Sequence, residues 1–323
     1  MQNKFSQYDK VVFVTGGAGF IGSNYLNKYV PRHAKYFFVN IDALTYAAKK
    51  ENVTAAKLSN YAFEKVDIRD AVKLERLFVK YHPTGIIHFA AESHVDLSIK
   101  DPNIFIETNV IGTNNLLSLA KKYGIKRFHH ISTDEVYGAL NDKRGIFTEK
   151  SPMAPRNPYS ASKAGADLMV MAYYETFGLN VVVTRSSNNY GPNQDTTKLI
   201  PSFVSKLLRG EPVPLYGKGE NIRDWLYVED NIDAIDLVFH KGRTGEVYNI
   251  GGNCELTNIA VVKKLLALTG RDAASIRYVE DRLGHDFRYA LSSEKLTNEL
   301  GWKPKMDFEK GIRNTLAFYK TIN

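Results

Sequence analysis

The sequence contains a single cysteine, Cys254, in 323 residues. One thiol excludes an internal disulfide and a cysteine-rich metal site, and it is typical of proteins in a reducing compartment. No metal-binding residue is predicted. The chain also lacks a run of about 18 apolar residues, which a membrane-spanning helix needs. Met1 to Lys10 is polar, and the apolar run Val11 to Val14 is too short for the core of a signal peptide. These absences predict a cytoplasmic protein without a membrane partner.

The positive charge is not clustered in the way that nucleic-acid binding requires. Lysine and arginine number 43 against 35 aspartate and glutamate, which gives a formal net charge of +8. Such an excess suits either nucleic acid or an anionic small substrate. The basic residues are scattered, and no run of five or more is interleaved with aromatic residues. We therefore expect no nucleic-acid partner.

Short apolar runs alternate with helix-like segments through the first half of the chain. The runs cover residues 11–14, 37–41, 61–66, 85–90, 126–131 and 181–184. This alternation is typical of right-handed βαβ units and a parallel sheet. Proline and glycine become frequent after Gly191-Pro192, and the alternation is lost.

The predicted fold class is therefore α/β, with two domains. Residues 1–185 are expected to form a Rossmann-like doubly wound parallel sheet. Residues 186–323 are expected to form a smaller mixed α/β domain that binds substrate. A strand predicted near 247–251 leaves open a return of the chain to the first sheet, so the second domain need not be contiguous.

Three glycines, Gly16, Gly19 and Gly22, stand between the first predicted strand and a helix-like run. They allow a tight turn and let a pyrophosphate approach the positive end of the helix. Asp42 ends the second strand, where a carboxylate accepts hydrogen bonds from ribose hydroxyls and repels a 2′-phosphate. The pattern predicts NAD rather than NADP. The alternatives, a plain turn for the glycines and a helix cap for Asp42, are disfavoured by the shared spacing.

Two further segments, Asp67-Ile68 and Phe89 to Ser93, follow the third and fourth predicted strands. Open parallel sheets bind ligands at the carboxyl ends of their strands. Either segment alone would be read as loop. Together with the glycine motif they are expected to border the same crevice.

Tyr159 and Lys163 are four residues apart, so they share one face of a helix that is predicted to begin after Asn157-Pro158. A nearby ammonium lowers the pKa of a phenol, so Tyr159 is predicted to act as a base toward an alcohol. Lys163 is also expected to hold the nicotinamide ribose. Alone, the pair would be an amphipathic surface pair; downstream of the glycine motif it predicts redox chemistry.

Thr133, Asp134 and Glu135 are predicted to finish the fifth strand, at the edge of the same crevice. Two adjacent acids raise the pKa of one of them, which favours one protonated and one ionised carboxyl near neutral pH. One acid can then donate a proton while the other removes one. In isolation, an acidic turn would be the simpler interpretation.

These motifs resemble those of the extended short-chain dehydrogenase/reductases and, within them, of the nucleoside-diphosphate-glucose 4,6-dehydratases. The resemblance covers essentially the whole chain and includes residues 41–46, 90–96, 187–192, 222–230 and 284–289. It implies a cycle that starts from dTDP-glucose or UDP-glucose, with oxidation at C4, loss of water across C5 and C6, and return of the hydride to C6. The product is a 4-keto-6-deoxy sugar nucleotide for deoxysugar or rhamnose biosynthesis. It also implies a homodimer formed through two helices of the first domain.

The resemblance implies a role for each catalytic residue. Tyr159 takes the proton of the C4 hydroxyl, Glu135 removes the C5 proton and Asp134 protonates the C6 hydroxyl, while Thr133 hydrogen-bonds the C4 oxygen. The implied cofactor contacts are Gly16, Gly19, Phe20, Ile21, Gly22, Asp42, Ala43, Leu44, Thr45, Asp67, Ile68, Phe89, Ala90, Ala91, Ser93, Thr108, Tyr159, Lys163 and Asn189.

The implied substrate contacts are Ser93, Thr133, Asn188, Lys198, Leu199, Pro214, Leu215, Tyr216, Arg223, Asn258, Arg282, His285 and Asp286. Arg223 is the expected anchor of the diphosphate, because a guanidinium fork matches phosphate oxygens. An ion pair with Asp224 or Glu229 is its alternative.

Two departures from the family pattern leave the nucleotide base open between thymine and uracil. Leu97 stands where the bacterial dTDP-sugar enzymes usually have arginine, and Asn193 to Thr197 replaces their aromatic-rich segment before Lys198. Gly191 to Gln194 looks more like the UDP-glucose enzymes.

Two rival functions remain. A UDP-hexose 4-epimerase generally lacks the Asp134-Glu135 pair, and a non-catalytic NAD-binding regulator has no chemical need for both acids together with Tyr159 and Lys163.

Overall fold

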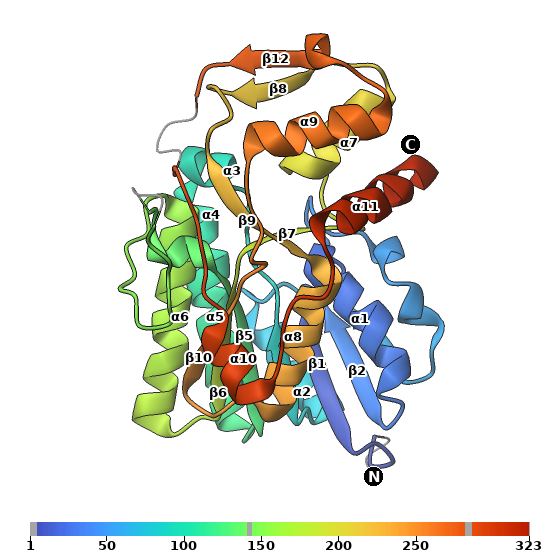
Figure 1. Ribbon diagram of the computed structural model, residues 1–323. Helices are drawn as coiled ribbons and strands as arrows, with labels where there is room; N and C mark the ends of the chain where they lie inside the picture. Colours follow the sequence, from blue (N-terminus) through green and yellow to red (C-terminus); the bar gives the residue numbers. More distant parts are fainter. Residues whose placement is uncertain (1–4, 141–143, 282–285, 323) are drawn as a thin grey trace.

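A seven-stranded parallel sheet forms the larger part of the molecule (Figure 1). The computed structural model describes residues 5–140, 144–281 and 286–322. The strand order is β10-β6-β5-β4-β1-β2-β3. The strands are β1 (Lys10–Thr15), β2 (Tyr36–Ile41), β3 (Tyr61–Glu64), β4 (Gly85–His88), β5 (Arg127–Thr133), β6 (Val181–Ser186) and β10 (Glu246–Ile250). Each of the predicted apolar runs is a strand of this sheet, and the predicted fold class is confirmed.

Helices cover both faces of the sheet because every strand is apolar on both sides. In β1, Val12 and Val14 pack against one helical layer, and Val11 and Phe13 against the other, as the alternation of side chains along a strand requires. The first layer contains α1 (Phe20–Arg32) and α8 (Val228–Lys241). The second contains α2 (Ala71–Tyr81), α5 (Thr113–Lys122) and α6 (Pro158–Phe177).

The smaller part has its own core beyond the carboxyl ends of the strands (Figure 1). Its sheets are β11-β9-β7 and β12-β8. The elements are β7 (Asn188–Tyr190), α7 (Leu199–Leu208), β8 (Val213–Tyr216), β9 (Ile222–Tyr227), β11 (Glu255–Thr257), α9 (Asn258–Thr269), β12 (Ile276–Val279) and α11 (Phe308–Ile322).

The chain returns to the large sheet after entering the smaller part. Helix α8 packs against α1, β10 pairs with β6, and α10 (Glu294–Leu300) contacts both β10 and α8. The strand predicted near 247–251 is therefore β10.

Short elements complete the fold: α3 (Val95–Lys100), α4 (Pro102–Phe105), the π-helix η3 (Ile106–Gly112), and the 3-10 turns η1 (Lys50–Asn52), η2 (Thr54–Lys57), η4 (Asp134–Tyr137) and η5 (Ala273–Ser275). In the part of the chain that the structure describes, none of the helices combines the length and the apolar character that crossing a membrane demands.

Candidate active site

A cleft lies at the carboxyl ends of β1, β2, β4 and β5, and it collects most of the residues predicted to bind the cofactor. The predicted residues that line it are Gly16, Gly19, Phe20, Ile21, Gly22, Asp42, Ala43, Thr45, Asp67, Ile68, Phe89, Ala90, Ala91, Ser93, Thr108, Tyr159 and Lys163. The predicted Leu44 and Asn189 are not among the lining residues. Leu44 adjoins the cleft through its main chain, and Asn189 lies in β7, where its carbonyl accepts from the cleft residue Gln194.

The glycine turn packs so closely against neighbouring backbone that a side chain would not fit at Gly16 or Gly22. Gly16 has a φ of +69°, and a Cβ there would lie 2.6 Å from the amide nitrogen of Ala90. A Cβ on Gly22 would lie 2.4 Å from the carbonyl oxygen of Gly16. The N-cap of α1 is Gly19, which offers no capping side chain, and the first turn holds no acidic residue. The amide groups of this turn therefore fit the pyrophosphate of a dinucleotide.

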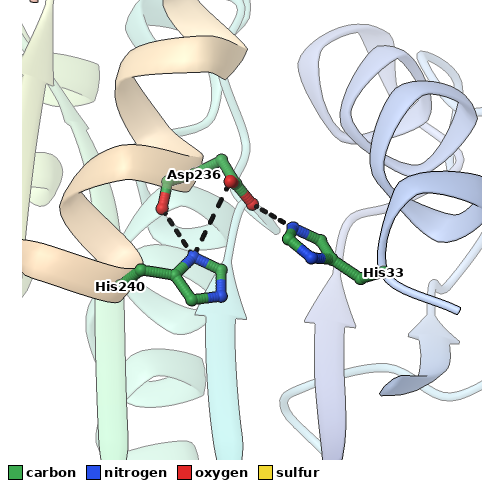
Figure 2. A group of neighbouring side chains, drawn as sticks. All are labelled: His33, Asp236 and His240. Carbon is green, nitrogen blue, oxygen red and sulfur yellow. Dashed lines mark hydrogen bonds and ion pairs between the residues drawn. The ribbon is translucent and has the colours of Figure 1, made fainter. Parts of the chain in front are cut away.

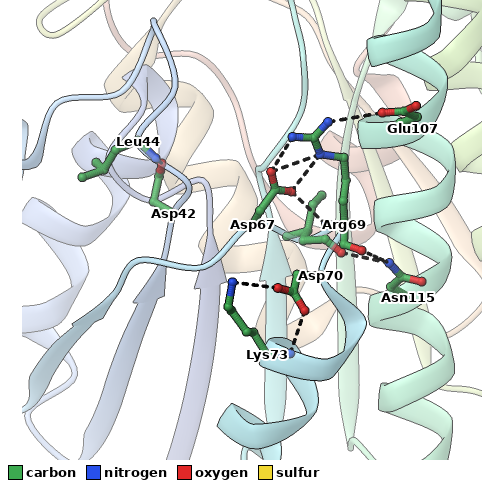
Figure 3. Close-up of polar contacts among 9 residues, drawn as sticks. Asp42, Leu44, Asp67, Arg69, Asp70, Lys73, Glu107 and Asn115 are labelled. Atoms are coloured by element: carbon green, nitrogen blue, oxygen red, sulfur yellow. Dashed lines mark hydrogen bonds and ion pairs between the residues drawn. The ribbon is translucent and has the colours of Figure 1, made fainter.

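Asp42 is built into the turn as well as facing the cleft (Figure 3). One carboxylate oxygen accepts from the amide of Ala18 at 2.9 Å and the other from the amide of Leu44 at 2.8 Å. Burial raises the pKa of Asp42, and the two amide bonds oppose that rise. Because a carboxylate oxygen accepts more than one hydrogen bond, both oxygens retain capacity for ribose hydroxyls.

Arg69 is a cleft residue that the sequence patterns did not single out. Its guanidinium forms a fork with Asp67, with a shortest distance of 2.7 Å, and an ion pair with Glu107 at 3.3 Å (Figure 3). The sequence signal that could have identified Arg69 as a cleft residue is its position directly after the predicted segment Asp67-Ile68. The fork holds a flat cationic group at the wall of the cleft.

Asp134 and Glu135 lie in η4, directly after β5, rather than in the strand as predicted. Thr133 is the last residue of β5, and its hydroxyl accepts from the amide of Glu135 at 3.3 Å, so the chain turns here. Asp134 is only 2% exposed. Burial, and then the charges of Glu135 and Asp224, raise the pKa of Asp134 well above its usual range. The direction agrees with the predicted rise for one of two adjacent acids, but burial rather than the adjacency is its largest cause.

Tyr159 and Lys163 share one face of α6, which begins with a capping box formed by Asn157 and Ser160. The ammonium of Lys163 donates to the carbonyl of Ile131 in β5 at 2.7 Å, and burial lowers the pKa of Lys163 to about 8. Burial, and then Glu135, raise the pKa of Tyr159, while a hydrogen bond with Thr133 lowers it. The predicted lowering by Lys163 is wrong for the protein alone, because burial and the negative charges of Glu135 and Asp134 penalise the phenolate of Tyr159.

Arg223 lies in β9 and is 7% exposed. Its guanidinium donates to the carbonyls of Ile222 at 2.8 Å and Asp286 at 3.0 Å, and it lies over the ring of Tyr289. The charge of Arg223 acts on Asp134, and the charge of Glu135 acts on Tyr289. The predicted diphosphate anchor and the two acids are thus close enough for their charges to interact, and Tyr289 and Asp224 lie within the same range.

The remaining substrate candidates are divided between the cofactor cleft, which Ser93 and Lys198 line, and elements of the smaller part. The ammonium of Lys198 donates to the carbonyl of Ser93 at 2.8 Å. Leu199 begins α7, Asn258 begins α9, and Pro214, Leu215 and Tyr216 belong to β8. Leu215 is 2% exposed and packs in the core of the smaller part, so only its main chain can reach a ligand. Arg282 and His285 lie outside the described residues.

Several buried polar atoms at the site have no hydrogen-bond partner. They are Asp134 Oδ2, Asn188 Oδ1, Asn189 Oδ1, Gln194 Oε1 and Asn258 Oδ1. An unsatisfied buried polar atom is costly and calls for a partner. Four of these five atoms belong to predicted catalytic, cofactor or substrate residues, and other buried atoms without a partner lie elsewhere among the described residues, for example on His129, Asn231 and Asn249.

Comparisons with known proteins agree with this geometry. A family model described as GDP-mannose 4,6-dehydratase matches residues 13–315. A Haemophilus influenzae protein named dTDP-glucose 4,6-dehydratase is 48% identical over 95% of this chain and 97% of its own length.

Two solved structures are similar over nearly the whole chain. One is a dTDP-glucose 4,6-dehydratase from Streptomyces venezuelae with NAD and TYD bound, with 45% identity and a TM-score of 0.93 over 96% of this chain and 97% of that one. The other is a UDP-glucose 4-epimerase from Thermotoga maritima with UDP-glucose, with 33% identity and a TM-score of 0.90 over 97% of this chain and 99% of that one.

Proposed function

The chain belongs to the GDP-mannose 4,6-dehydratase family of the extended short-chain dehydrogenase/reductases, and from this we propose that it is an NAD-dependent dTDP-glucose 4,6-dehydratase. The product would be the 4-keto-6-deoxy-glucose nucleotide. The observation that carries the proposal is the pair Asp134 and Glu135, in which a buried acid with a raised pKa and an unpartnered oxygen stands beside a second carboxyl. An oxidoreductase or epimerase needs no such pair.

The residues divide the chemistry between them. NAD, when bound, supplies the hydride acceptor and a positive charge that favours the phenolate of Tyr159. Tyr159 takes the proton of the C4 hydroxyl, and Thr133, which is hydrogen-bonded to Tyr159, orients the C4 oxygen. The C4 ketone acidifies C5, so Glu135 can remove the C5 proton. Asp134 donates its proton to the C6 hydroxyl, which makes water the leaving group.

The residues around the crevice would hold the two ligands. We propose that the glycine turn, Asp42 and Lys163 bind NAD, and that Arg223, Asn188, Lys198 and Asn258 bind the nucleotide sugar. Support comes from the cleft for the first set and from the buried position of Arg223 and the unpartnered amide oxygens for the second.

We propose thymine rather than uracil as the base. Relatives that are 45–48% identical to this chain include several named dTDP-glucose 4,6-dehydratase. The segment that departs from their pattern packs on the cofactor side: Gln194 and Asp195 line the cofactor cleft, and Asn193 donates to the hydroxyl of Ser23 in α1 at 3.3 Å. Its divergence therefore does not argue for another base.

Parallel kinetics with dTDP-glucose and UDP-glucose test the function. Purified protein with NAD should form a product with the alkaline absorbance of a 4-keto sugar. Its kcat/KM should favour dTDP-glucose by about 10- to 200-fold, the range that one methyl group provides in an apolar pocket. If neither sugar gives keto product while the folded protein binds NAD, the dehydratase proposal is wrong. If UDP-galactose accumulates from UDP-glucose instead, the protein is an epimerase.

We propose that the protein is a homodimer in the cytoplasm and that helices of the larger part form the interface. Large apolar side chains are exposed on neighbouring elements there: Ile106 and Ile111 on η3, and Leu168 on α6, which is 59% exposed. Exposed apolar groups of this size, gathered on packed helices, are typical of self-association surfaces.

Leu168→Arg is expected to convert the dimer to a monomer, because it places a charge in the apolar interface. Light scattering coupled to size-exclusion chromatography measures the change. Val72→Arg, at an exposed apolar residue of α2 outside this surface, is the matched control and should stay dimeric. A monomeric wild type, or a dimeric Leu168→Arg, would contradict the proposed interface.

A further inference from the structure

A second cluster of chemically active side chains lies far from the cleft. His33 caps the carboxyl end of α1, and Asp236 and His240 lie one turn apart near the carboxyl end of α8 (Figure 2). None of the three lines the cofactor cleft. His240 instead adjoins Lys10, Gly85 and residues before β5, at the amino ends of the strands. The proposed reaction therefore has no use for this cluster.

The carboxylate of Asp236 lies between the two imidazole rings (Figure 2). One oxygen is 3.1 Å from His33 Nε2, and the other is 3.7 Å from His240 Nδ1. Each of the three residues offers one nitrogen or oxygen that could bind a metal, and these three atoms lie within 4.8 Å of one another. Among the described residues, no other group of histidine, cysteine, aspartate or glutamate side chains meets this condition. Atoms bound to one zinc ion are about 3.4 Å apart, so small side-chain rotations bring all three into range.

Two tyrosines hold the cluster in place. The hydroxyl of Tyr25 donates to Asp236 Oδ1 at 2.9 Å, and the hydroxyl of Tyr36 lies 3.2 Å from His240 Nε2. Outer hydrogen bonds of this kind fix the orientation and tautomer of metal-binding imidazoles and carboxylates. With Nε2 bonded to Tyr36, His240 Nδ1 is the nitrogen that faces Asp236, and it must lose its proton, now donated to the Asp236 carbonyl at 2.8 Å, before it can bind a metal.

We propose that His33, Asp236 and His240 bind a divalent transition-metal ion, with Zn²⁺ as the best chemical match. Two imidazoles and one carboxylate suit Zn²⁺ and similar ions, whereas Mg²⁺ and Ca²⁺ prefer oxygen ligands. The three side chains are partly buried, so water can complete the coordination. The ion would link the carboxyl end of α1 to α8. These two helices pack together although they are far apart in the sequence.

The same contacts also describe a cluster without an ion. His33 Nε2 already pairs with Asp236, and His240 Nδ1 lies 2.8 Å from the carbonyl of Asp236. A metal would replace these hydrogen bonds. Binding stoichiometry and its dependence on each ligand separate the two cases.

Full-length protein treated with a chelator and then titrated with Zn²⁺ or Co²⁺ provides the test. Calorimetry should find one ion per chain, and Co²⁺ should develop the visible absorption of a low-symmetry site. His33→Ala and His240→Ala should each weaken binding at least tenfold, and Tyr36→Phe by about 10- to 100-fold. His82→Asn, at an exposed histidine outside the cluster, should bind as the wild type does.

Thermal unfolding gives a second readout, because an ion that binds only the folded state raises Tm. Zn²⁺ should raise the Tm of the wild type and of His82→Asn but not that of His33→Ala. NAD binding confirms that each variant is folded. The proposal is overturned if wild-type protein shows no saturable binding up to millimolar metal, or if folded His33→Ala and His240→Ala bind with wild-type affinity.

Discussion

Glu135→Gln is expected to oxidise the substrate at C4 but to stop before water is lost. Glutamine keeps the size of the side chain and removes the base, so the C5 proton stays in place. Loss of a positioned general base costs about 10²- to 10⁴-fold in rate, and formation of the 4-keto-6-deoxy product should fall by that factor. In D₂O, deuterium should no longer enter C5, while NADH formed from bound NAD should still appear on mixing with dTDP-glucose. Wild-type deuterium entry at C5 would refute the role of Glu135.

Asp134→Asn is the matched partner of this experiment. Its amide cannot protonate the C6 hydroxyl, so water loss should also be slow. Glu135 remains, however, so C5 exchange with solvent should continue. If the two variants behave alike in exchange, the acids do not have the separate roles assigned to them.

Asp167→Asn is expected to destabilise the protein by about 3–5 kcal/mol, the cost of breaking a buried ion pair from one side. Asp167 is 0% exposed and lies one turn after Lys163 on α6. Its carboxylate is 2.8 Å from Arg185 Nε and 3.3 Å from His130 Nε2. Without that charge, the guanidinium of Arg185 stays buried, and its other hydrogen bonds to described residues are with the hydroxyl of Tyr137 and the sulfur of Met153. Urea unfolding at pH 7 measures the loss.

The stabilisation that the Asp167 carboxylate gives the folded protein should decrease as the pH falls. Burial raises the pKa of Asp167, but Arg185 and His130 outweigh burial and hold it at about 2. A depressed carboxyl pKa stabilises the folded state above the unfolded value of about 3.9, and the stabilisation is lost as pH falls toward 2. The difference in the free energy of unfolding between wild type and Asp167→Asn should therefore be constant from neutral pH down to about pH 5. It should become smaller below about pH 4.

Glu211→Gln is the control, because Glu211 pairs with Arg209 on the surface. Exposed pairs contribute little, so this variant should unfold with the wild type at every pH. Equal effects of the two substitutions would contradict the importance of burial at Asp167.

The local features of the site were predictable from the sequence because they are short. The glycine turn, Asp42 and the Tyr159-Lys163 pair each depend on neighbours within one strand, turn or helix, and the cleft contains all of them. The end of β5 was less predictable, since the switch from strand to η4 depends on the hydroxyl of Thr133 accepting from Glu135.

Contacts between distant segments could not be predicted from patterns. Asp224, which is 90 positions from Asp134 in the sequence, adds to the rise that burial causes in the pKa of Asp134. In the same way, the charge of Glu135 adds to the rise in the pKa of Tyr289. Leu215 is part of a core that only the assembled α7, α9 and β8 create. The cluster of His33 with Asp236 and His240 likewise exists only because α1 and α8 pack on the same face of the sheet.

The return of the chain to the large sheet determines how the protein can be divided. A fragment ending at residue 185 would leave β6 as an open edge, because β10 is its partner, and would uncover the apolar face that α8 protects. We propose that residues 1–185 are therefore only the first portion of the NAD-binding domain. A chimera designed to change substrate preference would have to exchange the excursions 187–227, 251–293 and 303–322 together, while α8, β10, α10 and Trp302, which packs in the core with α8, stay with the sheet.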